Sequence, residues 1–259
     1  KLLKKNVPPF KIDGSFSFLR AISIGSRRIY KKPDTSPENI AALQYTGGTT
    51  GVTRGVMLTH RNMLTNIAQI KVRLSTDIEE GQEIVVNPLP FYHIYPLIMS
   101  CGVFFEMGCH TVLIAEGNDV DRFVADISKW QFSVILGIDS LLARLCSHDT
   151  FRQFDLSALK LTTAGGSALM TSTARRWRKL TGKEITEGYG LSETSAVVTI
   201  NPIGGSQLGT VGIPLIHTEI KVVDEEGAML TFGKTGELCV RGPQVMKGYW
   251  QRPEETRTV

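Results

Sequence analysis

Hydrophobic residues along this chain fall into two patterns: short continuous runs, and positions spaced every three or four residues. The continuous runs are bounded by glycine, proline or polar residues and predict buried strands, whereas the spaced positions predict helices packed by one face. The predicted strands cover 40–44, 56–58, 83–90, 111–114, 134–136 and 159–163, and the predicted helices cover 63–74, 97–107, 121–130 and 138–145. Strands that alternate with helices favour an α/β fold, here a doubly wound, mixed or parallel sheet flanked by helices.

The pattern changes after Gly209 to short strands separated by turns, over 212–214, 219–223 and 236–242. This predicts a β-rich C-terminal subdomain, a small barrel or half-barrel. Residues 1–39 are basic, carry scattered prolines and are only locally apolar. We therefore expect an N-terminal segment with a linker over 1–39, an α/β subdomain over 40–205 and a β-rich subdomain over 206–259.

Composition narrows the class of protein. The 259 residues are 42% hydrophobic, which is enough for a substantial core, and the net charge of +4 comes mostly from scattered Lys and Arg. The basic run 175–179 is typical of a solvated helix face, so we expect no nucleic acid as a partner. Cys101, Cys109, Cys146 and Cys239 lack the close paired spacing of a zinc site and favour free thiols in the cytoplasm. No apolar run reaches the roughly 20 residues of a membrane span.

The stretch from Tyr45 to Gly55, YTGGTTGVTRG, has the composition of a phosphate-binding loop. Its glycines allow several backbone N–H groups to point at one centre, and its threonine hydroxyls and Arg54 add donors and positive charge. It is not the common Gly-Lys-Ser/Thr loop, and a Gly/Thr hairpin without a ligand is the alternative. The candidate phosphate-binding residues are Thr46, Gly47, Gly48, Thr49, Thr50, Gly51 and Arg54.

A second candidate stretch runs from Glu184 to Thr194 and has too few apolar residues for a core strand. It places Tyr189 between two glycines and Glu193 four residues later, so the ring could stack on a base and the carboxylate could hold a hard divalent cation. The alternative for Glu193 is a charge at a helix N-terminus.

Two predicted strand ends carry further candidates, because ligands in open α/β sheets bind beyond the carboxyl ends of the strands. The loop after 83–90 contains His93, for which a structural, hydrogen-bonded role is the alternative. The strand 159–163 runs into Gly165, Gly166 and Ser167, where a flat group could approach the backbone, and a plain turn is the alternative.

Together these stretches identify a resemblance. YTGGTTGVTRG with VMLTHRNM, TEGYGLSET, VGIP and GELCVRGPQVMKGYWQRPEET resemble, in order, the motifs of the adenylate-forming superfamily, and bacterial long-chain fatty-acyl-CoA synthetases most closely. The resemblance covers residues 40–259 and departs from the usual pattern at three places: Arg54 stands for a lysine, Ser192 for a threonine and Leu97 for a gating tryptophan of some relatives. Arg54 keeps the charge but not the shape of lysine.

The resemblance implies roles for individual residues. It makes Thr46, His93 and Glu193 catalytic, with Glu193 and the Thr46 hydroxyl as Mg²⁺ ligands and His93 beside the acyl carboxylate. It makes Tyr189 the adenine stacker, places the adenine and the start of the acyl chain at Gly165 and Gly166, and implies that the start of the helix after Gly137 lines the acyl pocket. The nucleotide-binding residues it implies are the phosphate-loop set above together with Gly165, Gly166, Ser167, Glu187, Gly188, Tyr189, Gly190 and Ser192.

The implied activity is conversion of a long-chain fatty acid, ATP and coenzyme A to acyl-CoA, AMP and diphosphate, with Mg²⁺ as cofactor. In the family a ribose-binding aspartate, a hinge and a small domain with the catalytic lysine follow this region, so we expect the fragment to be inactive alone. The resemblance also allows peripheral contact with the inner face of the membrane and a homodimer of the full-length protein. Two alternatives stay open: activation of an aromatic or amino acid, although Asp139 could equally be a helix cap, and a non-catalytic nucleotide- or lipid-binding role.

Overall fold

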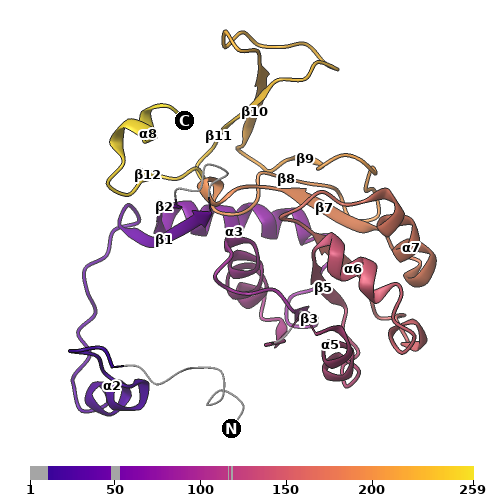
Figure 1. The fold of residues 1–259 in the computed structure, drawn as a ribbon, viewed down its shortest axis with the longest axis horizontal. Helices are drawn as coiled ribbons and strands as arrows, with labels where there is room; N and C mark the ends of the chain where they lie inside the picture. The colour runs from indigo at the N-terminus through magenta and orange to yellow at the C-terminus, as the bar shows by residue number, and fades with distance from the viewer. Residues whose placement is uncertain (1–10, 48–52, 116, 118) are drawn as a thin grey trace. The chain divides into compact units, whose positions relative to one another are not determined.

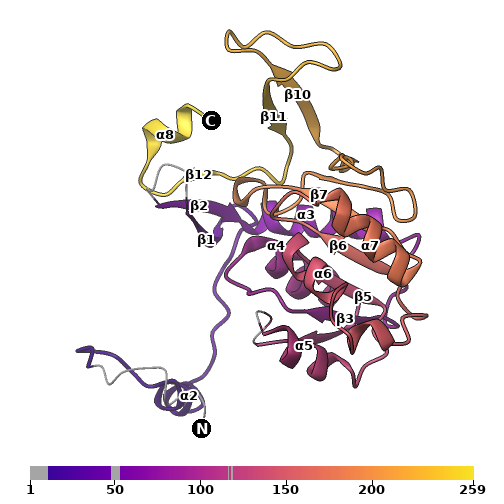
Figure 2. The same cartoon turned by 45° about the vertical axis from the view of Figure 1, so that its right-hand side comes forward.

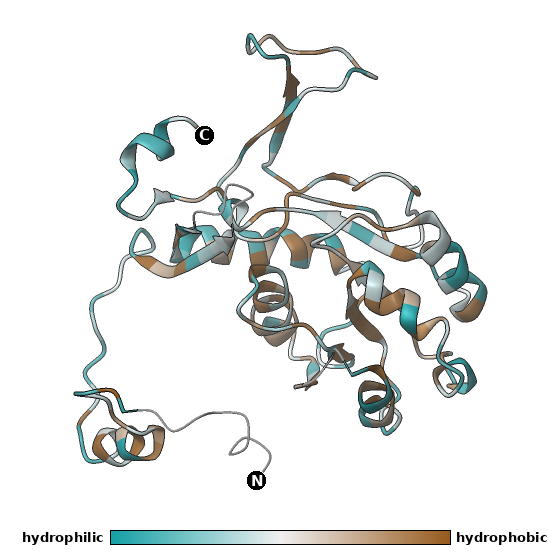
Figure 3. Cartoon of the chain, viewed as in Figure 1, coloured by the Kyte–Doolittle hydropathy of each residue, from teal (hydrophilic) through white to brown (hydrophobic). Residues whose placement is uncertain are grey.

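The computed structural model describes residues 11–47, 53–115, 117 and 119–259, and the chain forms two compact units, residues 1–35 and 36–259 (Figure 1). The first unit contains α2 (Phe18–Gly25), whose N-cap is Ser17: its side chain accepts a hydrogen bond from the Arg20 N–H. No residue of α2 is buried, so its apolar side chains, such as Phe18 and Leu19, face solvent; much of this helix is coloured brown, for hydrophobic residues, in Figure 3.

The second unit is built on a seven-stranded sheet with the order β4-β3-β5-β6-β7-β8-β9. The first five strands in this order are parallel, and β8 and β9 are antiparallel additions at one edge. Their bounds are β3 (Ile84–Asn87), β4 (His110–Leu113), β5 (Val134–Gly137), β6 (Leu161–Ala164), β7 (Ile185–Tyr189), β8 (Thr199–Ile200) and β9 (Ile213–Pro214). The predicted mixed or parallel sheet is confirmed.

Helices cover both faces of this sheet (Figures 1 and 2). Neighbouring strand residues point to opposite faces, so Val85 joins one hydrophobic cluster with Ile70 and Phe104, while Val86 joins another with Phe123 and Trp177. Because both faces of the sheet are buried, the sequences of these strands are nearly continuous apolar runs. The helices are α3 (His60–Leu74), α4 (Ile94–Pro96), η1 (Leu97–Phe104), α5 (Val120–Ile127), α6 (Asp139–Leu145), the 3₁₀ turn η2 (Phe151–Gln153) and α7 (Thr171–Thr181).

The predicted helix over 97–107 is present, but its backbone is π-helical from Leu97 to Phe104. Gly102 lets η1 approach α3 closely, since a Cβ at this position would lie 2.6 Å from Cδ1 of Ile67. None of the helices in the described part of the chain is long and apolar enough to span a membrane.

A separate three-stranded antiparallel sheet has the order β1-β2-β12. The strands β1 (Ile40–Gly47) and β2 (Thr53–Thr59) include the predicted strands 40–44 and 56–58 and form a hairpin, and β12 (Gly248–Tyr249) pairs with β2. Thr59 ends β2 and caps α3: its hydroxyl accepts the Asn62 N–H, and the Asn62 side chain accepts the Thr59 N–H. This cap fixes the direction in which the chain leaves the hairpin.

Two predictions need correction. The stretch 184–194 was expected to be too polar for a core strand, yet β7 lies inside the sheet between β6 and β8, with Ile185 and Thr186 buried. Sheet hydrogen bonds, rather than apolar side chains alone, stabilise it.

The predicted small barrel is not confirmed. Among the described residues, β10 (Glu219–Val223) and β11 (Glu237–Arg241) form a two-stranded hairpin. The next strand, β12, pairs with β2 instead, and the short helix α8 (Pro253–Arg257) follows it.

Candidate functional site

The end of the β1–β2 hairpin carries two of the predicted phosphate ligands. Thr46 and Arg54 are directly opposite each other in the register, so their side chains project from the same face. One step along, Gly55 faces Tyr45, and a Cβ at Gly55 would lie 3.3 Å from Cζ of the Tyr45 ring. Gly47 ends β1. The predicted ligands Gly48, Thr49, Thr50 and Gly51 lie outside the described residues.

Glu193 lies on a tight turn that packs against this hairpin. The turn η3 (Ser192–Thr194) is closed by the Thr194 hydroxyl, which accepts the Leu191 N–H at 3.0 Å. Ser195 and Ala196 follow with φ of 58° and 126°, in the region that glycine prefers. Gly190 must be glycine for steric reasons, because a Cβ there would lie 1.6 Å from the Ala196 carbonyl oxygen. The chain therefore folds back on itself and presents Glu193 toward β1 and β2.

Tyr249 joins Glu193 to Arg54. The Tyr249 hydroxyl donates a hydrogen bond of 2.8 Å to Oε1 of Glu193, and the Arg54 guanidinium lies 5.5 Å from the centre of the Tyr249 ring. Burial, followed by the neighbouring Glu193, raises the pKa of Tyr249 to about 12, so the hydroxyl is protonated and is the donor at neutral pH. The structure thus brings the predicted phosphate cation, over the ring face, and the predicted metal ligand, at the hydroxyl, to one side chain.

Arg54 is paired with a residue of α8. Its Nε atom contacts Oε2 of Glu255 at 2.5 Å. This hydrogen bond raises the pKa of Arg54 and lowers the pKa of Glu255. The pair keeps the guanidinium at the hairpin end.

The loop after β3 holds the predicted His93. The His93 ring is exposed and lies 4.6 Å from the Tyr92 ring, measured between ring centres. Gln44 of β1 donates a hydrogen bond of 2.8 Å to the Tyr92 carbonyl, which ties this loop to the strand that carries Thr46. The hairpin end and the His93 loop are therefore neighbours, although no side-chain bond joins His93 to Thr46 or Glu193 among the described residues.

Tyr95 connects the His93 loop to the strand end after β6. Its hydroxyl is 2.6 Å from the Thr163 hydroxyl, and burial raises its pKa. A Cβ on Gly165 would touch the Tyr95 ring at 3.5 Å. One side of Gly165 is thus already filled by protein. Gly166 has a φ of +79° with nothing within 4 Å of a Cβ, and Ser167 is exposed, so these two residues present an open surface.

Two carboxylates hold the segment that follows Ser167. Oε1 of Glu187 accepts the Leu169 N–H at 2.9 Å, and Oδ1 of Asp139 accepts the Met170 N–H at 2.8 Å. Burial and the nearby Asp139 raise the pKa of Glu187, although the Leu169 N–H acts in the opposite direction. Asp139 therefore fixes the start of α7 as well as beginning α6.

The other predicted residues of this stretch lie at the end of β7 and just after it. Gly188 packs closely on β8, since a Cβ there would be 3.0 Å from the Thr199 carbonyl oxygen. Tyr189 and Ser192 are half-buried, and the Tyr189 backbone pairs with Thr199. The glycines on either side of Tyr189 thus have a packing role in the folded chain, besides any role at a ligand.

The oxygen atoms of Glu193 and Thr46 suit a magnesium ion that also binds phosphate oxygens. Within residues 11–47, 53–115, 117 and 119–259, no three His, Cys, Asp or Glu side chains converge to form a site of their own. Mg²⁺ typically takes one or two carboxylates together with phosphate oxygens and water. Glu193, with the Thr46 hydroxyl on the facing hairpin, has the oxygen chemistry that such a shared site needs.

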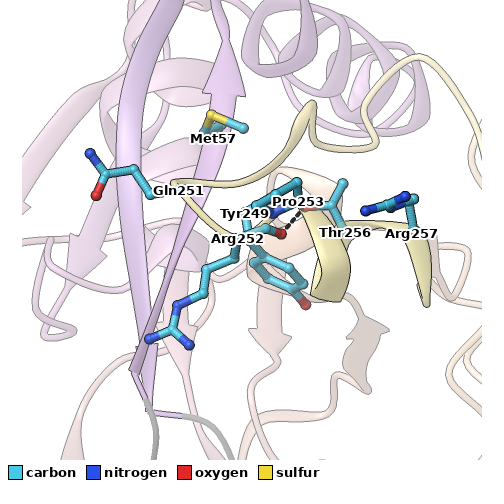
Figure 4. A pocket seen from close by; sticks show the side chains of 7 residues that line it. All are labelled: Met57, Tyr249, Gln251, Arg252, Pro253, Thr256 and Arg257. Carbon is cyan, nitrogen blue, oxygen red and sulfur yellow. Dashed lines mark hydrogen bonds between the residues drawn. The ribbon is translucent and has the colours of Figure 1, made fainter.

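A pocket of about 460 Å³ opens between β2, β12 and α8 (Figure 4). Its lining includes Met57, Thr256 and the side chains of Arg252 and Arg257, and Tyr249 is the member that also contacts Glu193. The pocket lies beside the predicted phosphate ligands but does not include Thr46, Arg54 or Glu193. It is therefore distinct from the site described above.

The residues that sequence reasoning missed are Tyr249, Glu255, Tyr95 and Gln44. Tyr249 and Glu255 fall within a recognised motif, but their contacts with Glu193 and Arg54 depend on the pairing of β12 with β2. No local spacing predicts contacts across such long separations. Tyr95 lies two residues after His93, and an aromatic residue just beyond the predicted strand 83–90 was the available signal.

The chain is similar to known proteins in both sequence and fold. The family described as AMP-binding enzyme matches residues 6–250. The long-chain-fatty-acid–CoA ligase of Escherichia coli O157:H7 is 43% identical over 99% of this chain, and 4-coumarate-CoA ligase 2 of Narcissus pseudonarcissus is 28% identical over 99%. The solved structure of ATP-bound MatB from Rhodopseudomonas palustris superposes with a TM-score of 0.79 and 28% identity, covering 92% of this chain and 47% of that one. This chain spans 46% of the length of both curated relatives.

Proposed function

The chain belongs to the AMP-binding enzyme family, and we propose that it is the nucleotide- and acyl-binding part of a long-chain fatty-acid–CoA ligase. The observation that carries the proposal is the meeting of Arg54 and Glu193 on Tyr249 at the hairpin end. A fixed cation and a carboxylate at one glycine-rich hairpin suit a metal-bound polyphosphate. The choice of acid is supported by identity, which is 43% to a ligase named for long-chain fatty acids and 28% to one named for 4-coumarate.

In the proposed reaction, an oxygen of the fatty carboxylate attacks the α-phosphorus of ATP, and the bond to the β-phosphate oxygen breaks. Diphosphate leaves, and the acyl group stays joined to AMP as a mixed anhydride. The sulfur of coenzyme A then attacks the acyl carbon, loses its proton, and displaces AMP to give the thioester. Such transfers depend mostly on positioned donors and on stabilisation of negative charge.

Each predicted residue has a role in this scheme. Arg54, the Thr46 hydroxyl and backbone N–H groups of the hairpin orient the phosphates, and the phosphate-loop residues Gly47, Gly48, Thr49, Thr50 and Gly51 complete the set. Glu193 and Thr46 would hold Mg²⁺, which neutralises phosphate charge when bound. Tyr189 stacks on the adenine, with Glu187, Gly188, Gly190 and Ser192 around it.

The acyl group is proposed to lie along the carboxyl edge of the parallel sheet. His93 orients the carboxylate, and the open surface at Gly165, Gly166 and Ser167 receives the start of the acyl chain. Leu97 is half-buried at the start of η1, where a smaller side chain than tryptophan leaves the entry wider. Placing the two reactants on neighbouring loops tied by Gln44 would bring carboxylate and α-phosphate together.

Further proposals rest on the sequence patterns and on the family resemblance. The division into 1–39, 40–205 and 206–259, a cytoplasmic location, peripheral membrane contact, a homodimer and inactivity of this chain by itself belong to this group. We therefore test the proposed function by binding rather than by turnover.

The experiment is calorimetric titration of the chain with non-hydrolysable acyl-adenylate analogues of increasing acyl length. Affinity that rises with chain length, and exceeds that of an aromatic acyl analogue, is expected. A control titration with AMP alone isolates the acyl contribution. Equal affinity for long-chain, aromatic and aminoacyl analogues would contradict the fatty-acid assignment, and no binding by a folded chain would contradict a preformed adenylate site.

A further inference from the structure

Tyr249 is held rigidly by its backbone. Within the sheet, Tyr249 pairs with Val56, and the next residue, Trp250, donates its N–H to the Gly55 carbonyl at 2.7 Å. The Tyr249 N–H donates to the Thr256 hydroxyl at 2.9 Å, and the residue is 5% exposed. The ring therefore projects from a strand that is fixed to the hairpin carrying Arg54 (Figure 4).

The same segment holds the turn that carries Glu193. The Met246 N–H donates to the Glu193 carbonyl at 2.7 Å, and the Ser195 hydroxyl donates to the Gln244 carbonyl at 2.8 Å. The Glu193 side chain is then oriented by the hydroxyl of Tyr249. Both the backbone and the carboxylate of Glu193 thus depend on residues 244–249.

We propose that Tyr249 is a positioning residue that orients the Glu193 carboxylate for Mg²⁺ bound to ATP. The proposal rests on the proposed function, because it assumes that Glu193 receives the metal. A phenol hydroxyl donates one hydrogen bond to Oε1 and leaves Oε2 free to bind a cation. Partners that fix a metal-binding carboxylate in this way commonly control metal affinity.

Tyr249 also separates two opposite charges. Arg54 lies over the ring face and pairs with Glu255, whereas Glu193 bonds to the hydroxyl at the ring edge. Among the ion pairs of the described residues, Arg54 is joined to Glu255 and not to Glu193. The arrangement keeps Glu193 available to the metal and the guanidinium at the hairpin end for phosphate.

The test compares ATP binding with saturating Mg²⁺ and with EDTA, by calorimetry on the whole chain. The quantity of interest is the metal increment, defined as the ratio of the two affinities. Variants are Tyr249→Phe, Glu193→Gln and the double variant, with Trp250→Phe as a control that changes the neighbouring ring but keeps its backbone hydrogen bond. Thermal unfolding by circular dichroism checks that each variant is folded.

We expect Tyr249→Phe to reduce the metal increment by about tenfold or more, with affinity in EDTA and the Trp250→Phe increment unchanged. Because Tyr249 acts through Glu193, adding Tyr249→Phe to Glu193→Gln should cause no further loss of the metal increment.

The positioning role would be overturned if Tyr249→Phe kept the metal increment of the wild type while Glu193→Gln lost it. The proposed function would still stand in that case. An increased increment would also overturn the positioning role, since Tyr249 would then compete with the metal. A wild-type chain without any metal increment would contradict the proposed metal site and, with it, the role of Tyr249.

Discussion

The hairpin end and the carboxyl edge of the parallel sheet are built in different ways. The hairpin end draws Arg54, Glu193 and Tyr249 from three distant segments and joins them through side chains. The carboxyl edge consists of loops that directly follow β3 and β6, and it leaves His93 and Ser167 exposed. A site for charged phosphates benefits from groups fixed in advance, whereas a surface for a flexible acyl chain needs mainly open space.

Substitutions at two glycines should show the largest difference between the hairpin end and the carboxyl edge. Gly190→Ala should destabilise the chain by about 3 kcal/mol or more, because its Cβ would overlap the Ala196 carbonyl and force the turn apart. Gly166→Ala, at the open edge, meets no atom within 4 Å and should cost only about 1 kcal/mol for its positive φ. Urea unfolding measures both. Equal destabilisation would show that the turn around Glu193 is no more tightly packed than the edge.

Removal of the Glu193 carboxylate should affect only the hairpin end. In Glu193→Ala, the affinity for Mn²⁺ in the presence of ATP should fall by at least about tenfold, because loss of a residue that only hydrogen-bonds a metal ligand already has an effect of this size. Electron paramagnetic resonance measures the bound Mn²⁺. Glu219→Ala removes an exposed carboxylate on β10 and serves as the control. Retained Mn²⁺ binding in Glu193→Ala would remove the metal assignment.

The pH dependence of stability tests the role of Glu187 at the carboxyl edge of the sheet. Its raised pKa means that the folded state binds the proton more tightly than the unfolded state. Stability from this group is therefore greatest below the unfolded pKa of about 4.5 and is lost as pH rises through the folded pKa. Glu187→Gln keeps an oxygen for the Leu169 N–H and lacks the charge, so it should match the wild type in acid and be more stable at neutral pH. Chemical unfolding at several pH values checks this, and parallel pH profiles would contradict it.

Arg54→Lys should have the smallest effect. Lysine keeps the positive charge that attracts phosphate but loses the planar contact with Glu255 and the Tyr249 ring. Since ion pairs that stay partly exposed to solvent contribute little, we expect less than about a fivefold change in ATP affinity in EDTA. Arg54→Gln removes the charge and should weaken binding further. Equal loss in both variants would show that guanidinium shape, rather than charge, decides the interaction.

Local patterns were sufficient to predict most of the fold. Continuous apolar runs placed the strands that are buried on both faces, and apolar positions at helical spacing placed residues 63–74 in α3. One exception, β7, contains Thr186 and Glu187, whose backbones pair with β6, while the Glu187 carboxylate accepts the Leu169 N–H. Polar strands of this kind cannot be recognised from hydrophobicity because tertiary hydrogen bonds stabilise them.

The candidate site was predicted in its parts rather than in its connections. Arg54 and Glu193 were candidates because the stretches around them contain glycines and few apolar residues, and their roles stay predictions. Their common contact with Tyr249 depends on the antiparallel pairing of β12 with β2, and no local signal specifies that pairing. The expected barrel went unconfirmed for a related reason: turn-rich short strands do not reveal whether they close on one another or join another sheet.

Hydrogen–deuterium exchange of the chain with and without Mg²⁺ and ATP tests the central claim most directly. If the hairpin end, the η3 turn and β12 form one nucleotide site, ATP should protect peptides spanning residues 44–59, 190–196 and 244–250 together. Omitting Mg²⁺ should reduce the protection most at residues 190–196. Protection confined to other regions, such as the charged surface around Lys160 and Arg178, would contradict the account.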